Sequence, residues 1–139
     1  MRNIIFRGRS IAHHGKKEVW VYGFYSNYKG VNGRTHYISS DNGNSIAVRG
    51  ETVGQYTGLT DKYGRKIFEG DLVSYMIVTG GIEDLAIPAN VRHIVKYDEK
   101  HGAFRIGYHY FCDGTMREVA DANNLVVIGN IHDNPELLD

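Results

Sequence analysis

Cysteine is nearly absent from this chain of 139 residues, which has only Cys112. One cysteine excludes a disulfide within the chain and a zinc site built from several cysteines. A catalytic thiol is disfavoured too, because the sequence places no activating group beside it. No apolar run approaches the length of about 18 residues that a membrane span requires. The first residues also lack the apolar run of a signal peptide, so we expect a reducing, cytoplasmic location.

Net charge is also lacking, because 16 basic residues balance 16 acidic ones. Overall basicity is therefore no argument for binding to nucleic acid. The charges are nevertheless unevenly distributed: residues 1–40 carry a net charge of +6 and residues 113–139 carry −5. This asymmetry fits a polyanion site, a contact between oppositely charged surfaces, or terminal segments that neutralise each other within one fold.

Glycine and tyrosine are abundant, with 17 and 10 residues, whereas proline occurs only twice. This composition favours short strands joined by tight turns. Alternation with a period of two predicts strands, and these cover residues 4–9, 17–25, 34–39, 45–48, 71–78, 90–97, 103–110 and 125–131. Both faces of the 17–25 strand are apolar, so we expect both faces to be covered.

The connections between these strands contain turn residues, and a hairpin with Gly102 at a positive φ is predicted over residues 97–103. The one long connection without a clear period covers residues 79–89. We expect a mobile loop there, either a surface insertion or a binding loop. Helix is limited to one or two turns at 116–123 and a short turn that starts at Pro135.

Signatures of the phosphate-binding loop, the nucleophile elbow and the zinc hydrolases are missing. His93 and His109, on neighbouring predicted strands, make half a metal site at best. Asp61, Glu69 and Asp71 would suit a metal-dependent hydrolase, which is the third hypothesis for function. Turn formation explains these carboxylates better. We therefore expect no enzyme, and we assign no catalytic, cofactor-binding or metal-binding residue.

Two long motifs resemble the signatures of the YopX family of phage and prophage proteins. They are VGQYTGLTDKYGRKIFEGDLV at residues 53–73 and LVVIGNIHDNPELL at residues 125–138. The start at residues 4–7 is similar to the family's opening, although Gly8-Arg9 departs from its usual small-then-aromatic pair. The resemblance covers nearly the whole chain. It implies an all-β fold and a phage or prophage setting in a bacterial cytoplasm, and it brings no established activity, cofactor or catalytic residue.

We predict an all-β fold with little helix, in a single YopX-like domain over residues 1–139. An N-terminal β lobe covers residues 1–50, and a barrel-like lobe covers residues 51–139. The second lobe is expected to contain a small SH3-like β-barrel, roughly from Glu51 to Ile131.

The leading hypothesis for function is a non-enzymatic binding or assembly protein that self-associates as a homo-oligomer, with a host or phage protein as a further partner. Its basis is the missing catalytic signatures, the surplus of tyrosine and the opposite terminal charges. The alternative is a nucleic-acid-binding small β-barrel, with Tyr22, Tyr25 and Tyr28 as stacking surface. The residues expected on phosphates are Arg2, Arg7, Arg9, Lys16 and Lys17.

Overall fold

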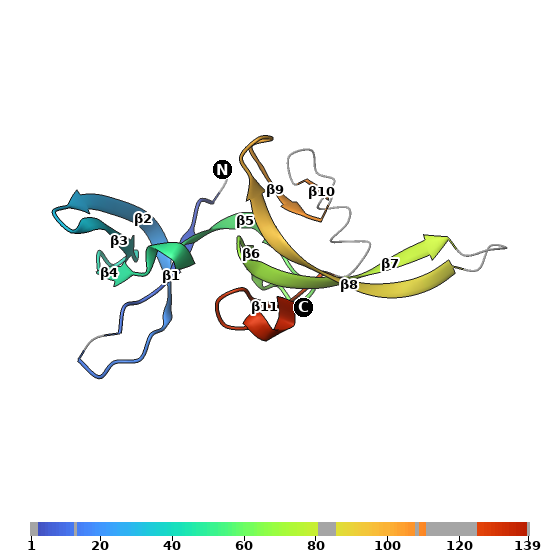
Figure 1. Cartoon of the computed structure of the whole chain (residues 1–139), viewed down its shortest axis with the longest axis horizontal. Coiled ribbons are helices and arrows are strands. Elements are labelled where there is room, and N and C mark those ends of the chain that lie inside the picture. The colour runs from blue at the N-terminus through green and yellow to red at the C-terminus, as the bar shows by residue number, and fades with distance from the viewer. Residues whose placement is uncertain (1–2, 13, 81–85, 108, 111–124, 139) are drawn as a thin grey trace. The chain divides into compact units, whose positions relative to one another are not determined.

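The structure is a computed structural model that describes residues 3–12, 14–80, 86–107, 109–110 and 125–138 (Figure 1). The chain divides into two compact units, Met1–Gly58 and Leu59–Asp139. All strand pairings are antiparallel. The described residues therefore confirm the predicted all-β class. None of their helices is long and apolar enough to cross a membrane.

The first unit is built on a meander of antiparallel strands. Alternation of residues with a period of two predicted strands in this part of the sequence, at 4–9, 17–25, 34–39 and 45–48. Its elements are β1 (Phe6–Arg9), β2 (Trp20–Gly30), β3 (Gly33–Ser39), β4 (Ser45–Val48), the 3₁₀ helix η1 (Gly50–Thr52) and β5 (Gly54–Thr60). Strands follow the order β4-β3-β2-β1-β5-β6 in this sheet, where β6 (Lys66–Phe68) belongs to the second unit.

One face of this meander forms the core of the first unit. Ile38 and Val48 are fully buried there. Tyr25 contributes to the same face, and its hydroxyl lies 2.6 Å from Nδ1 of His36. The outer edge of β4 is occupied by the segment that follows β1, because Ser10 forms an antiparallel bridge with Val48. An edge strand covered in this way has fewer backbone groups left to pair with another chain.

The second unit contains a five-stranded sheet in the order β10-β9-β8-β7-β11. Its elements beyond β6 are β7 (Asp71–Gly80), β8 (Ala86–Asp98), β9 (Ala103–Ile106), β10 (His109–Tyr110), β11 (Val126–Asn130) and the 3₁₀ helix η3 (Pro135–Leu138). Strands β7 and β8 form a long hairpin (Figure 1). The buried core consists of Ile67, Val73, Tyr75, Val95, Ile106 and Leu125.

The predicted SH3-like barrel is not confirmed. A barrel requires the first and last strands of a sheet to pair, whereas β10 and β11 stand at opposite edges of the five-stranded sheet. Within the described part of the chain, the strands form two open antiparallel sheets. The division between the two units falls after Gly58, and the lobes predicted from the sequence divide after residue 50.

Some predicted elements need correction. The 103–110 strand is two strands, because Gly107 adopts φ +57° and His109 then pairs back with Ile106. The predicted 79–89 loop is too long, since β7 reaches Gly80 and β8 begins at Ala86. Residues 81–85 and the predicted 116–123 helix lie outside the described residues. Strands β5 and β6 were missed.

The hairpin expected over residues 97–103 is confirmed. Asp98 pairs with Ala103, and Gly102 has φ +62°. The Asp98 carboxylate accepts hydrogen bonds from the backbone N–H groups of Lys100 at 3.0 Å and His101 at 3.3 Å. Such bonds hold the chain in the reversal that the turn needs.

We predict that Gly23→Ala strongly destabilises the first unit. Gly23 has φ +155°, and a Cβ atom there would lie 2.1 Å from the backbone oxygen of Ser39. The free energy of unfolding, measured by chemical denaturation, should fall by about 3 kcal/mol or more. Gly30→Ala on the same strand is the control, because its Cβ would lie 3.4 Å from the nearest atom, and it should cost less than about 1 kcal/mol. Equal stability of the two variants would contradict the argument.

Candidate functional site

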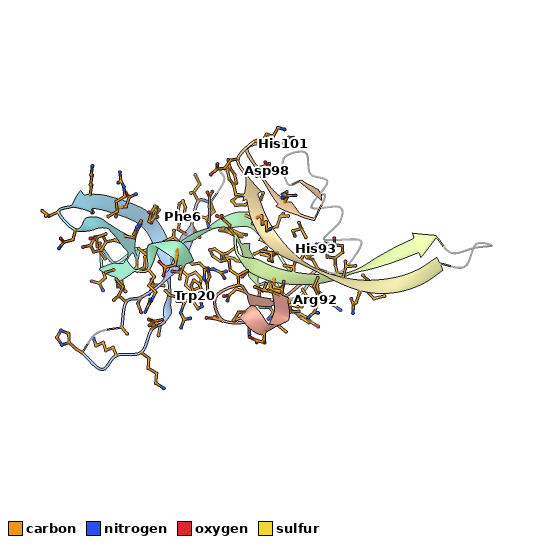
Figure 2. All side chains as sticks on the ribbon, viewed as in Figure 1. Phe6, Trp20, Arg92, His93, Asp98 and His101 are labelled. Atoms are coloured by element: carbon orange, nitrogen blue, oxygen red, sulfur yellow. The ribbon has the colours of Figure 1, made fainter. Side chains whose placement is uncertain are left out.

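Two of the arginines that the sequence assigned to phosphate contacts face the interior or a carboxylate. Arg7 is only 6% exposed, and its guanidinium carbon lies 4.6 Å from the centroid of the Trp20 ring. Trp20 is labelled in Figure 2. Arg9 lies on the same face of β1 and places Nη2 3.5 Å from Oε2 of Glu18. Glu18 also accepts a hydrogen bond of 2.9 Å from Nε of Arg49. Arg7 and Arg9 are therefore both engaged in contacts within the first unit.

The other predicted basic residues are placed differently. Lys16 and Lys17 are exposed in the connection between β1 and β2. Arg2 lies outside the described residues. Of the four predicted cations that the structure describes, Lys16 and Lys17 are therefore exposed, whereas Arg7 is buried.

An exposed row of aromatic side chains lies on one face of β2. Tyr22, Phe24 and Tyr28 are 51%, 60% and 64% exposed, and alternation places all three on the same face. Tyr37 of β3 extends this face, with its ring centroid 5.9 Å from that of Tyr28 in an edge-to-face contact. We call Tyr22, Phe24 and Tyr28 the aromatic row. Its exposure shows that the expectation of two covered faces was wrong.

Tyr25 does not belong to the aromatic row, although the sequence grouped it with Tyr22 and Tyr28. It lies on the opposite face, hydrogen-bonded to His36, and its ring stacks on the His36 ring at 5.9 Å and 11°. The Phe6 ring also packs against Tyr25, at a centroid distance of 5.6 Å. Phe24 is the residue that sequence reasoning missed. Its alternation with Tyr22 was the available signal.

A hollow of about 520 Å³ borders the aromatic row in the first unit. Tyr22 and Phe24 form its aromatic wall, and Ser40, Asp41 and Asn42 supply hydroxyl, carboxylate and amide groups. Gly23, which lies between these two residues in the chain, also lines the hollow and adds no side chain. An aromatic wall with a few polar groups suits binding.

Two of the three carboxylates considered for hydrolysis, Asp61 and Asp71, serve the architecture of the second unit. The buried Asp61 carboxylate accepts backbone hydrogen bonds from Tyr63 and Arg65, both at 2.9 Å, and from Val127 at 3.1 Å. Asp71 is 1% exposed and accepts a bond of 2.8 Å from the backbone N–H of Phe68. The turn interpretation is confirmed for both residues. No three His, Cys, Asp or Glu side chains of the described residues are arranged to hold a metal ion.

Comparison with known proteins gives a family and a structural likeness. The family model described as YopX protein matches residues 6–139. The crystal structure of protein EF1440 from Enterococcus faecalis is 21% identical to this chain, with 100% of each chain covered and a TM-score of 0.48. No curated protein matches the chain.

We predict that Asp61→Asn lowers the free energy of unfolding at neutral pH by about 2–4 kcal/mol, because buried amide donors lose their charged acceptor. Burial acts to raise the pKa of Asp61. The hydrogen bonds from the Val127, Arg65 and Tyr63 amides and the Arg65 charge outweigh it, so the pKa lies below its ordinary value of 3.8.

The sign of the pH dependence follows from this lowered pKa. The ionised carboxylate contributes stability above the ordinary pKa of 3.8, and this contribution is lost as the pH falls through the lower pKa of the folded protein. Chemical denaturation at several pH values should therefore show the Asp61→Asn deficit shrinking in acid. Asp41→Asn, at an exposed position, is the matched control. A deficit that stays constant down to about pH 2 would disprove the role of the ionised form.

Proposed function

The chain belongs to the YopX family, and on this premise we propose that it is a non-enzymatic binding and assembly protein of phage or prophage origin. It acts in the bacterial cytoplasm and self-associates as a homo-oligomer. A host or phage protein is its further partner. The observation that carries this proposal is the aromatic row on β2, which is more than half exposed in the single chain.

Exposed aromatic side chains on one face of a strand are typical of a surface that becomes covered. Tyrosine and phenylalanine are enriched at the centres of protein interfaces, where they bury a large area at a small cost in side-chain entropy. Each such ring buries roughly 150–250 Å² when fully covered. Phe24 is 60% exposed and has no polar group with which to interact with water. The row therefore supports a binding role.

Charge complementarity favours a second copy of this chain as the occupant. The first unit has eight basic and three acidic residues, and the second has eight basic and thirteen acidic residues. Their net charges are thus +5 and −5. The first unit of one copy is electrostatically matched to the second unit of another copy. Such a contact joins two different surfaces and builds a ring or a filament.

The test is a double variant in the aromatic row, Phe24→Ser with Tyr28→Ser, compared with the parent chain by light scattering and sedimentation velocity. We expect the parent to form an oligomer that dissociates when salt rises from roughly 50 mM to roughly 500 mM, and the variant to be a monomer. Tyr63→Ser is the control, since Tyr63 is 68% exposed and lies outside the row. It should leave the oligomer intact. A parent chain that stays a strict monomer at high concentration would contradict self-association.

The second candidate function is binding of single-stranded nucleic acid. It is favoured by the position of the aromatic row in the unit of net charge +5. Bases stack on aromatic side chains whatever their sequence, and nearby cations hold the phosphates. Lys29 and Arg34 are exposed at the end of the β2–β3 hairpin that bears the row. This function ranks second because Arg7 is buried and Arg9 is paired with Glu18.

Fluorescence anisotropy with labelled single-stranded and duplex DNA and RNA at two salt concentrations tests this function. We expect single strands to bind more tightly than duplexes, with affinity that falls steeply as salt rises. Phe24→Ala should weaken the binding of single strands about tenfold through lost stacking. Tyr63→Ala should have no such effect. The absence of binding to every probe at low salt would rule this candidate out.

A further inference from the structure

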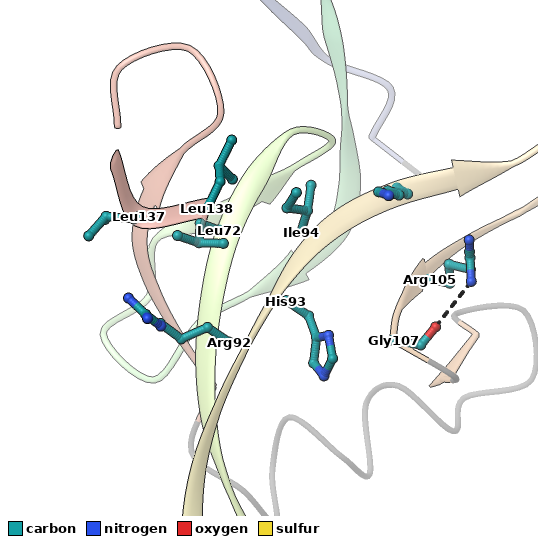
Figure 3. Close-up of a pocket in the computed structure, with 9 residues that line it drawn as sticks. Leu72, Arg92, His93, Ile94, Arg105, Gly107, Leu137 and Leu138 are labelled. Carbon is teal, nitrogen blue, oxygen red and sulfur yellow. Dashed lines mark hydrogen bonds between the residues drawn. The ribbon is translucent and has the colours of Figure 1, made fainter. Parts of the chain in front are cut away.

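A hollow of about 440 Å³ lies in the second unit, lined by residues of β7, β8, β9 and η3 (Figure 3). It is lined by three basic side chains, those of Arg92, Lys96 and Arg105. Leucine and isoleucine side chains line it as well. The hollow lies entirely within residues 59–139, so it is independent of the aromatic row.

Strand register concentrates the positive charge. Arg92 and Lys96 are four residues apart on β8, and alternation places them on the same face of that strand. Lys96 is also paired directly with Arg105 of β9. Like charges directly opposite each other in a sheet are destabilising. The fold therefore holds Lys96 beside Arg105, with Arg92 further along the same face of β8, in a unit whose net charge is −5.

Carboxylates of the protein compensate this charge only weakly. The carboxylate oxygen Oδ2 of Asp98 lies 3.9 Å from Nε of Arg105. The same carboxylate is 3.0 Å from Nδ1 of His101 and accepts the backbone N–H of Lys100, so it also serves the β8–β9 turn. Arg92 and Lys96 make no ion pair with a carboxylate in the described ranges. The hollow thus has positive charge in excess.

The apolar lining comes from the sheet and from η3. Leu72 and Ile94 are paired across β7 and β8. Leu138 of η3 is 43% exposed beside them. The position of η3 is set by the preceding turn, in which the backbone N–H of Asn134 donates to the carbonyl of Asn130 at 2.9 Å. These leucine and isoleucine side chains can contact an apolar group of a ligand whose charged group interacts with the basic residues.

We propose that this hollow binds a phosphate monoester that carries an apolar or aromatic group. A phosphate dianion offers several acceptor oxygens and two charges, which match guanidinium and ammonium donors better than a single carboxylate does. His93 also lines the hollow, but its ring lies on the other face of β8, with its centroid 5.8 Å from that of the Tyr75 ring. The volume falls within the range of about 300–1,000 Å³ that is usual for small-molecule sites.

Isothermal titration calorimetry of the whole chain with phenyl phosphate and with inorganic phosphate tests the proposal. We expect saturable binding of phenyl phosphate and weaker binding of inorganic phosphate. Lys96→Gln should weaken phenyl phosphate binding about tenfold, the effect of one charge-assisted hydrogen bond. Leu138→Ala should reduce the affinity for phenyl phosphate to near that for inorganic phosphate. Lys100→Gln is the charge-matched control, because Lys100 is exposed in the β8–β9 turn and does not line the hollow.

Two results would overturn the proposal: no saturable binding of phenyl phosphate at low salt, or an equal loss of affinity in Lys96→Gln and Lys100→Gln. Thermal unfolding of each variant verifies that the fold is retained. A free nucleotide and the 5′-phosphate of a nucleic acid strand share this chemistry. Thymidine monophosphate and a short 5′-phosphorylated single strand distinguish them, because the hollow's ligand should be the one that binds more tightly and competes with phenyl phosphate.

Discussion

The buried carboxylate of Asp61 joins the turn at Tyr63–Arg65 to strand β11, where Val127 lies 66 residues after Asp61 in the chain. A second bond reinforces this junction, because the backbone N–H of Lys62 donates to the carbonyl of the fully buried Leu125. The junction holds Leu125 against the core beside Ile67, which itself follows the turn on β6. One ionised group therefore fixes the edge strand β11 and the approach to β6. A buried charge is tolerated here because it accepts several hydrogen bonds at once.

Much of the fold could be predicted from the sequence, because strong alternation specifies a strand. The β4 strand was predicted with its observed bounds, and the strand predicted over residues 90–97 lies within the longer β8. Strands β5 and β6 were missed because their glycine-rich and short segments have no apolar period. The break at Gly107 was also missed, since alternation continues across it while the backbone φ of +57° reverses the chain. Local sequence patterns do not determine the order of strands in a sheet. For this reason the predicted barrel, which depends on that order, is not confirmed.

The candidate surface could be predicted only in part. Tyr22 and Tyr28 were chosen because they are aromatic and lie near basic residues. Tyr25 was chosen for the same reason, but it is half-buried on the opposite face of β2, where its hydroxyl is hydrogen-bonded to His36. When both faces of a strand are apolar, alternation separates the faces without telling which one is covered. That decision rests on contacts with residues distant in the chain. The burial of Arg7 against Trp20 is of the same kind, since it depends on the pairing of β1 with β2.

In the second unit, the net charge and the local charge around the hollow have opposite signs. The unit is acidic as a whole, yet the pairing of Lys96 with Arg105 keeps cations together around one hollow. Moving either residue to the neighbouring face would relieve the repulsion, but that face carries the buried Val95 and Ile106 of the core. The period of two in β8 and β9 therefore fixes the cations on the outer face once the core is formed. Repulsion that the core imposes in this way is offset when an anion occupies the hollow, and the anion then gains from a site already organised by folding.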